Sequence, residues 1–268
     1  MFVDSDVIVA PDVLSRFERL LSGGEVASAF GAYDDTPGDP GFVSQYRNLL
    51  HHHVHSCNAG EATTFWAGCG AVRADAFMTV HGYDAEAYPR PQIEDIDLGY
   101  RLHGAGFRIV LDPAIQGKHL KRWTLRGMLR TDLRDRAVPW MRLLLARGEA
   151  AEAGPLNLQI QERVFTALVG LACLTPVAAL LSLDARWLVL GLVLTLIVVL
   201  GNLPLFAWFG RTRGWLFALR VVPLRLLFYV TSGLGAAWAI ATYRVQPARR
   251  PIAPLSAVPD RAVASLSP

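Results

Sequence analysis

Long apolar runs in the second half of the chain constrain its structure more than any other feature. Most charged residues precede Arg163, whereas apolar runs fill residues 164–183, 187–209 and 226–242. A helix that crosses the hydrocarbon core of a bilayer needs about 20 apolar residues. The sequence therefore predicts a transmembrane region over residues 163–243, with two to three spans, after a domain that lies outside the bilayer.

The last apolar run leaves the number of spans open. Arg220, Pro223 and Arg225 interrupt the residues before it, which favours an interfacial helix followed by a third span. A full third span would place the following arginines outside the cell, against the usual excess of basic residues on the cytoplasmic side. Residues 244–268 are rich in proline, alanine and serine and are predicted to be disordered.

Basic residues concentrate between Lys118 and Arg147, directly before the first apolar run. Residues 126–162 are therefore expected to form amphipathic juxtamembrane helices at the anionic cytoplasmic face of the inner membrane. Nucleic-acid binding is the other common use of such a cluster, but no nucleic-acid-binding module accompanies it. We therefore expect a membrane as a partner, and no nucleic acid.

Short apolar runs alternate with amphipathic segments over residues 1–125, as in an α/β layered domain. The predicted strands cover residues 2–10, 26–32, 64–72 and 107–112, and the predicted helices cover residues 11–22, 42–56, 73–80 and 94–103. This number of elements is small for a whole domain. Because the first strand begins almost at Met1, we expect a complete protein to have about a hundred further residues in front of it.

Two carboxylates stand within the sequence Phe-Val-Asp-Ser-Asp at residues 2–6. In parallel α/β sheets, ligands gather at the carboxyl ends of strands. Paired carboxylates there suit a Mg²⁺ or Mn²⁺ ion that holds a diphosphate. Asp4 and Asp6 are therefore candidate metal ligands, and the alternative is an ordinary aspartate pair where a strand enters a turn.

Three more carboxylates, Glu94, Asp95 and Asp97, open a predicted helix. The helix dipole favours acidic residues in a first turn, and this structural role accounts for Asp97. A carboxylate that faces a cleft can instead take a proton from an acceptor hydroxyl as that hydroxyl attacks. Glu94 and Asp95 are the candidates for this chemistry.

In their combination and order, these motifs resemble family-2 glycosyltransferases of the GT-A fold, over about residues 2–125. The shared motifs are Asp-Ser-Asp at 4–6, Gly-Cys-Gly-Ala-Val-Arg at 68–73, Gly-Tyr-Asp at 82–84 and Glu-Asp-Ile-Asp-Leu at 94–98, with Arg101, Leu102 and Gly106. The resemblance implies a partial, Rossmann-like GT-A domain that binds a nucleotide sugar. It further implies that Asp4 and Asp6 hold the metal and the donor diphosphate. Asp95 would be the general base of an inverting displacement, and Glu94 would orient the acceptor.

The segment Lys-His-Leu-Lys-Arg-Trp at 118–123 follows the last predicted strand. By the same resemblance, His119 completes the metal shell, and a surface histidine near the membrane is the alternative. Arg122 can bind diphosphate oxygens and Trp123 can stack on a sugar ring. Both also suit a juxtamembrane amphipathic helix. The corresponding family motif is longer and usually starts with glutamine, which weakens an assignment as a processive polymer synthase.

Trp66 precedes a turn that contains Gly68 and Gly70. All three are candidate substrate-binding residues, although core packing is the more frequent role of a tryptophan. The histidines at 51–55 follow one another on a predicted helix and so point in different directions. We therefore expect a polar helix face near the membrane there, and not a metal site.

The cysteines of the chain, Cys57, Cys69 and Cys173, form no closely spaced pair. This predicts reduced thiols without a disulfide framework or a zinc site. Cys69 has no identifiable histidine partner in the sequence and is not expected to be a nucleophile.

The sequence thus predicts an inverting, metal-dependent, membrane-anchored glycosyltransferase. Its donor would be a cytosolic nucleotide sugar, and its acceptor a lipid or lipid-linked glycan at the bilayer surface. The alternative is a catalytically inactive membrane scaffold or partner subunit of a glycosyltransferase. A small transporter is disfavoured, because the predicted spans hold few charges and the carboxylates lie outside them.

Overall fold

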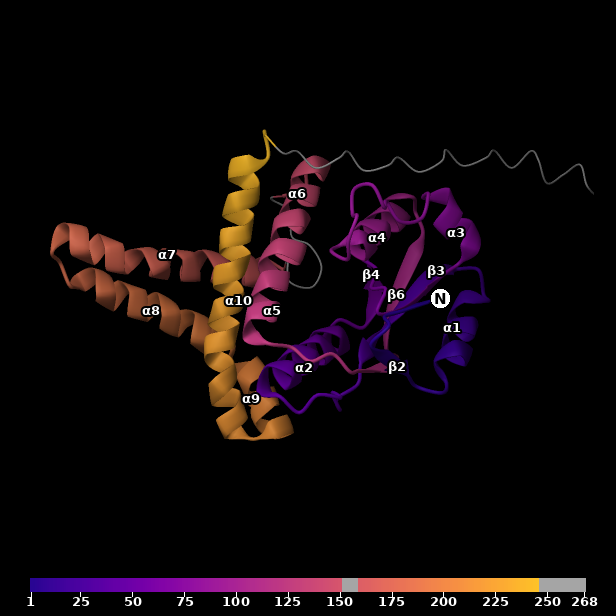
Figure 1. The fold of residues 1–268 in the computed structure, drawn as a ribbon, viewed down its shortest axis with the longest axis horizontal. Coiled ribbons are helices and arrows are strands. Elements are labelled where there is room, and N and C mark those ends of the chain that lie inside the picture. Colours follow the sequence, from indigo (N-terminus) through magenta and orange to yellow (C-terminus); the bar gives the residue numbers. More distant parts are fainter. Residues whose placement is uncertain (151–158, 246–268) are drawn as a thin grey trace, which may run out of the picture. The chain divides into compact units, whose positions relative to one another are not determined.

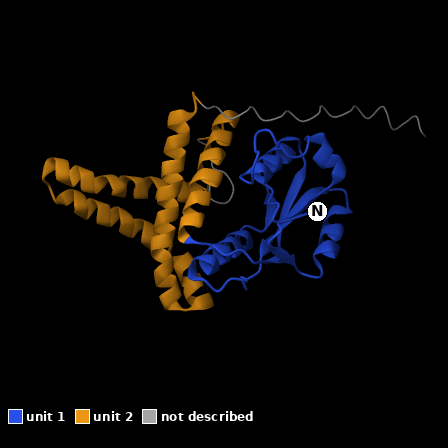
Figure 2. Ribbon diagram, viewed as in Figure 1, with its two compact units in different colours: residues 1–124, 249–268 blue, residues 125–248 orange. Residues whose placement is uncertain are grey.

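The computed structural model describes residues 1–150 and 159–245 and divides into two compact units (Figures 1 and 2). Unit 1 comprises Met1–Thr124, and unit 2 comprises Leu125–Ala248. The predicted disordered tail lies outside the described residues from residue 246 onward, and so do residues 151–158 of the predicted juxtamembrane segment.

Unit 1 is a mixed α/β unit built on one sheet with the strand order β1-β5-β3-β6-β2, in which β4 also pairs with β6. The strands are β1 (Phe2–Val3), β2 (Val7–Val9), β3 (Val26–Tyr33), β4 (Gly60–Ala62), β5 (Cys69–Val72) and β6 (Arg108–His119). The helices are α1 (Val13–Leu21), α2 (Phe42–Cys57), α3 (Ala74–Thr79) and α4 (Glu94–Gly104). The alternating pattern of the sequence therefore correctly predicts an α/β unit.

Strand β3 is the centre of the sheet, and all its residues are buried. It pairs with β5 in the antiparallel direction and with β6 in the parallel direction. Apolar side chains cover both faces, with Phe30, Leu98 and Ile109 in one cluster and Phe17 and Ile115 in the other. Burial on both faces explains why β3 is apolar at nearly every position, with Ser28 as an exception.

The predicted strand over residues 2–10 is wrong, because the structure has two short strands there with a turn between them. The Val7 N–H donates to the Asp4 carbonyl at 3.0 Å, which closes the turn. Strand β1 pairs with β5 and β2 pairs with β6, both antiparallel. Aspartate and serine favour turns because their side chains can hydrogen-bond to nearby backbone. That preference outweighs the apolar residues on either side.

Two other strand predictions have wrong boundaries. Of residues 64–72, only β5 is a strand, whereas the strand predicted at 107–112 continues to His119 as β6. The extension carries His119 opposite Val7 of β2. The additional length of β6 therefore brings two candidate site segments together.

Unit 2 consists of helices throughout its described residues. They are α5 (Leu125–Arg130), the π-helix η1 (Thr131–Ala137), α6 (Val138–Arg147), α7 (Ile160–Ser182), α8 (Arg186–Gly201), α9 (Leu203–Arg213) and α10 (Trp215–Thr242). Helices α7 and α10 are long and apolar enough to cross a membrane, with mean hydropathies of 2.3 and 1.4. The described residues thus offer two candidate spans, or three if α8 and α9 together form one.

Two details of the predicted membrane region differ from the structure. Residues 187–209 do not form one straight helix, because α8 and α9 meet at a bend of 57°. Residues 215–242 are one helix that continues through Pro223, not an interfacial helix followed by a separate span.

Candidate functional site

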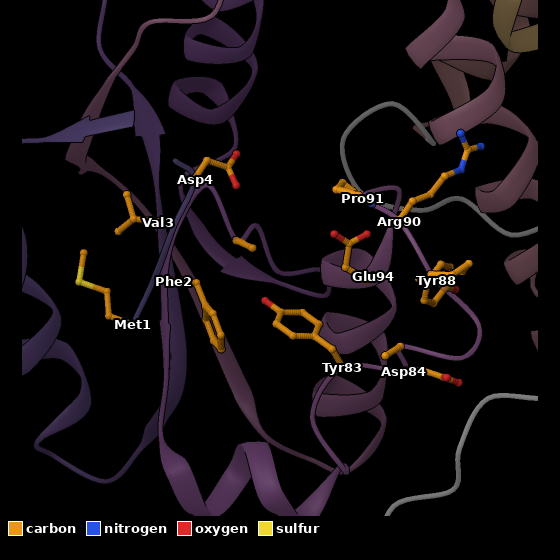
Figure 3. Close-up of a pocket in the computed structure, with 13 residues that line it drawn as sticks. Met1, Phe2, Val3, Asp4, Tyr83, Asp84, Tyr88, Arg90, Pro91 and Glu94 are labelled. Atoms are coloured by element: carbon orange, nitrogen blue, oxygen red, sulfur yellow. The ribbon is translucent and has the colours of Figure 1, made fainter. Parts of the chain in front are cut away.

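A pocket with a volume of about 540 Å³ lies in unit 1 beside the end of β1 (Figure 3). Its wall includes Asp4, the turn residue Ala67, the loop from Tyr83 to Pro91, and Glu94 at the start of α4. Figure 3 shows the carboxylates of Asp4 and Glu94 on two sides of the same opening, with the Tyr83 ring beside them. The fold therefore gathers candidate site residues from distant parts of the chain.

Backbone hydrogen bonds fix the position of Asp4. Its N–H donates to the Gly68 carbonyl at 3.2 Å, and its own carbonyl closes the turn to Val7. The Asp4 residue is exposed. The turn that the sequence did not predict is thus what presents this carboxylate to the pocket.

The two candidate catalytic carboxylates are held by backbone donors around the start of α4. Asp95 accepts hydrogen bonds from the Ala67 N–H at 3.1 Å and from the Ile96 N–H at 2.8 Å. Glu94 accepts one from the Gln92 N–H at 2.6 Å. Because Ala67 also lines the pocket, its bond to Asp95 places that carboxylate next to the pocket wall.

The Tyr83 hydroxyl lies close to all three of these carboxylates. Burial, followed by the negative charges of Asp95, Glu94 and Asp4, raises its pKa well above the ordinary value. The hydroxyl is buried and has no hydrogen-bond partner among the described residues. It therefore remains a neutral O–H that can donate to a bound ligand. Tyr83 belongs to the Gly-Tyr-Asp motif at residues 82–84, but the sequence predicted no role for its side chain.

Asp6 lies on the other side of the turn from Asp4 and contacts His119. The distance between the Asp6 Oδ1 and the His119 Nε2 is 3.4 Å. The other ring nitrogen, Nδ1, lies 2.6 Å from the Asn48 Oδ1, and the ring stacks on Tyr33 with its centroid at 4.3 Å. His119 is thus a buried, oriented imidazole, which differs from the alternative of a surface histidine.

A metal ion would find two protein ligands here. Asp6 and His119 form a carboxylate–imidazole pair, and Asn48 orients the imidazole as hydrogen-bonded partners do in metal sites. Among the described residues, no group of three histidine, cysteine or acidic side chains could hold a metal ion. The pair suits an ion such as Mg²⁺, which is usually bound by one or two carboxylates together with substrate phosphates and water.

Trp66, Gly68 and Gly70 do not line the pocket. The Trp66 ring packs against Tyr33 with centroids 4.9 Å apart and against His51 at 4.5 Å. A Cβ at Gly68 would lie 2.2 Å from the Trp66 ring, and one at Gly70 would lie 2.5 Å from Phe65. These glycines make room for aromatic packing under the turn that carries Ala67.

The expectation of a polar helix face is wrong for His52 and His55, whose side chains bind the sheet. His52 and His55 donate from Nδ1 to the carbonyls of Tyr33 and Gly31, at 2.7 and 2.8 Å. Helix α2 therefore packs its histidines on strand β3. The register of β3 against β6 shifts between Phe30 and Ala32, and the histidine at 55 satisfies the carbonyl between them.

Arg122 and Trp123 also lie apart from the pocket residues. Arg122 is exposed. The Trp123 backbone N–H donates to the Ser44 hydroxyl at 2.8 Å, and the Lys121 Nζ lies 4.6 Å from the Trp123 ring centroid. Trp123 thus joins the end of unit 1 to α2 within the same unit.

Asp97 has a structural role other than the one that the helix dipole suggests. Its side chain is only 5% exposed, and its Oδ2 accepts from the Arg101 Nε at 2.9 Å. Arg101 also donates to the carbonyls of Val80 and Gly82. This buried pair fixes the turn at residues 80–82 that leads into Tyr83. It therefore helps to position a residue that lines the pocket.

Cys69 should resist thiol reagents at neutral pH, while Cys57 should react. Cys69 is buried, and burial raises the pKa of its thiol to about 11, so the reactive thiolate is scarce below that pH. Cys57 is exposed. Mass spectrometry after treatment with a maleimide at pH 7 checks this, and fast modification of Cys69 in the folded chain would contradict it.

Comparisons with protein-family models and with curated protein sequences find no match to this chain. The geometry provides carboxylates and a partnerless hydroxyl at one pocket, and a carboxylate–imidazole pair across the adjacent turn.

Proposed function

We propose that this chain acts as an inverting, membrane-bound glycosyltransferase with a GT-A-type site in unit 1. The observation that carries the proposal is the convergence of Asp4, Glu94 and Asp95 around the partnerless Tyr83 hydroxyl. Asp4, Tyr83 and Glu94 line a pocket of about 540 Å³, which is in the size range of small-molecule sites. Asp95 does not line it but is bonded to Ala67 in its wall.

In the proposed reaction, Asp95 accepts the proton of the acceptor hydroxyl while the hydroxyl oxygen attacks the anomeric carbon of the sugar. The bond from that carbon to the diphosphate oxygen breaks, and the nucleoside diphosphate leaves with the bonding electrons. Attack from the face opposite to the leaving group inverts the anomeric centre. The bond from the Ala67 N–H keeps the Asp95 carboxylate oriented at the pocket wall.

Glu94 and Tyr83 have supporting roles in this proposal. Glu94 is bound to the Gln92 N–H through one oxygen and can accept a hydrogen bond from the acceptor through its carboxylate. The buried Tyr83 hydroxyl can donate to a substrate oxygen. Binding of substrate would therefore satisfy a buried polar group that has no hydrogen-bond partner among the described residues.

The residues of this chain fit a Mg²⁺ or Mn²⁺ ion held by Asp6 and His119, with Asp4 across the turn. When bound, such an ion neutralises negative charge on the diphosphate leaving group. His119 presents one nitrogen toward Asp6, and Asn48 fixes the ring through the other. The chain's own contribution is to orient these ligands before the donor arrives.

The acceptor proposed for this site is a lipid or lipid-linked glycan, and the donor is a nucleotide sugar from the cytosol. The apolar helices of unit 2 support membrane association. A catalytic unit in the same chain as these helices would act on acceptors at the cytoplasmic face of the inner membrane.

An assay of the full chain in membranes tests the proposed function. Membranes are incubated with radiolabelled nucleotide sugars, and the lipid extract is counted and analysed by mass spectrometry. We expect label in the lipid fraction that depends on the chain and is lost when EDTA removes divalent ions. An inactive scaffold would give neither transfer nor donor hydrolysis above membranes that lack the chain.

A further inference from the structure

Helix α10 passes the length and hydropathy test for a span, yet its neighbours in unit 2 carry many charges. Its C-terminal half runs beside η1 and α6 (Figure 1). A Cβ at Gly235 would lie 2.4 Å from the Ala137 Cβ, and the Arg142 guanidinium donates to the Thr242 hydroxyl at 3.0 Å. Residues 235–242 of α10 therefore pack directly against residues 137–142.

The segment beside α10 does not suit the interior of a bilayer. Residues 125–147 contain six arginines and two aspartates. Arg130, Arg134 and Arg136 are exposed on its surface. If α10 crossed the bilayer, its packing would carry much of this segment into the hydrocarbon, where exposed charges are unfavourable. The same residues suit a surface of anionic headgroups.

The α7–α8 hairpin has the opposite character. Near its base, Phe165 and Val169 pack with Tyr229 of α10, and from there the hairpin extends away from α10 (Figure 1). Beyond Val169 its outer surface is apolar and exposed, as at Leu171, Leu174, Leu181, Leu188, Leu192 and Leu196. From Glu162 to Ser182 the helix rises by about 30 Å at 1.5 Å per residue, which matches the thickness of the hydrocarbon core.

A buried polar cluster fixes how the hairpin crosses α10. The Arg225 guanidinium donates to both carboxylate oxygens of Glu162, at 2.6 and 2.7 Å, and to the Asn202 Oδ1 at 2.9 Å. The Tyr229 hydroxyl donates to the same Asn202 oxygen at 3.1 Å. The cluster joins the start of α7, the bend between α8 and α9, and the middle of α10. The hairpin therefore cannot align with α10 as a parallel span without breaking a buried ion pair.

Helix α10 also has a surface that suits the headgroup region. Leu216 and Leu219 near its start and Leu234 and Trp238 near its end are exposed, and helical spacing places them on one side. Arg220 is exposed on the same side. The opposite side packs on α6 and α7 through buried residues such as Tyr229 and Ala239. Exposed leucines and tryptophan with an arginine among them, and basic helices alongside, suit a helix that lies in the membrane interface.

The geometry points to an anionic lipid bilayer as the partner of unit 2, with the α7–α8 hairpin inserted and α10 lying along the surface beside η1 and α6. The hairpin enters the bilayer and returns, so Arg126 before it and Arg244 after it lie on the same side. This arrangement also removes the conflict between a third span and the positive-inside tendency. It does not depend on the proposed catalytic function.

Cysteine accessibility in sealed membrane vesicles tests the arrangement. The three native cysteines are replaced by alanine in the full chain, and single cysteines are introduced as Arg126→Cys, Ala185→Cys and Arg244→Cys, all at exposed positions. Vesicles of each orientation are treated with a membrane-impermeant maleimide. We expect the cysteines at 126 and 244 to be labelled in vesicles of the same orientation. Neither should be labelled in vesicles of the opposite orientation. Labelling of 126 and 244 in opposite orientations would overturn the proposal.

Ala185→Cys at the tip of the hairpin is the internal control. Labelling only in the opposite orientation, or protection in both, supports insertion of the hairpin, whereas labelling together with residue 126 overturns it. Protease accessibility of a C-terminal tag on the chain with its native cysteines gives the same readout if alanine replacement disturbs folding. Release of the chain by an alkaline carbonate wash would show that the apolar hairpin docks on protein and not in lipid.

Discussion

Replacement of Asp95 by asparagine should lower kcat/KM for sugar transfer by about 10²- to 10⁴-fold, the usual contribution of a general acid–base group. The asparagine side chain has nearly the same shape and can still accept from the Ala67 N–H through its amide oxygen. It cannot take the proton of the acceptor hydroxyl. Initial rates of label transfer to lipid, measured over a range of donor concentrations in membranes, give kcat and KM separately.

Asp12→Asn is the matched control for this prediction. Asp12 is an exposed carboxylate before α1, it does not line the pocket, and it pairs with Arg16 on the surface. The same loss of charge there should leave both kinetic constants unchanged. If Asp95→Asn transferred sugar at the wild-type rate, Asp95 would not be the base, while transfer itself would still establish a glycosyltransferase.

Elements whose signals are local could be predicted from the sequence. Strand β3 is a nearly continuous apolar run, and helix α4 starts at an acidic cluster and ends near glycines, so both were predicted to within a residue or two. The apolar runs of α7 and α10 likewise indicated helices that could enter a membrane. In each case the information lies within one stretch of chain, where composition and periodicity are sufficient.

Features that depend on distant partners could not be predicted in this way. The histidines of α2 looked like a polar face because nothing near them in the sequence shows that the Gly31 and Tyr33 carbonyls require donors. Gly68 looked like a substrate-binding residue, whereas it leaves space for the Trp66 ring. Both roles follow from how separate elements meet in the folded unit.

The candidate site shows the same division. The acidic residues were recognised from their local patterns, yet their grouping around Tyr83 depends on a turn at residues 4–6 that was predicted as strand. Asp97 was attributed to the helix dipole, although Arg101 follows at the i, i+4 spacing at which a carboxylate and a guanidinium can pair on one helix. The structure shows that Arg101, one helical turn later, holds it inside the core.

Replacement of Arg101 by methionine should destabilise unit 1 by about 3–5 kcal/mol, as expected when one partner of a buried ion pair is removed. The Asp97 carboxylate, 5% exposed, would lose the guanidinium that pairs with it, and the carbonyls of Val80 and Gly82 would lose their donor. Loss of that much stability should lower the unfolding midpoint by about 10 °C or more. Near-UV circular dichroism of the full chain in detergent, recorded during heating, measures the midpoint.

Two comparisons distinguish a buried unpaired charge from a general loss of arginine contacts. Arg16→Met removes an exposed partner of Asp12, and because water screens that pair, the midpoint should not change. The double replacement Asp97→Leu with Arg101→Met removes both charges and should recover much of the loss, since apolar residues can replace a buried pair at little cost. The stability that the double variant does not recover measures the contribution of the Arg101 hydrogen bonds to the carbonyls of Val80 and Gly82. A double variant no more stable than Arg101→Met would show that these carbonyl contacts, and not the Asp97 charge, make Arg101 necessary for the turn that carries Tyr83.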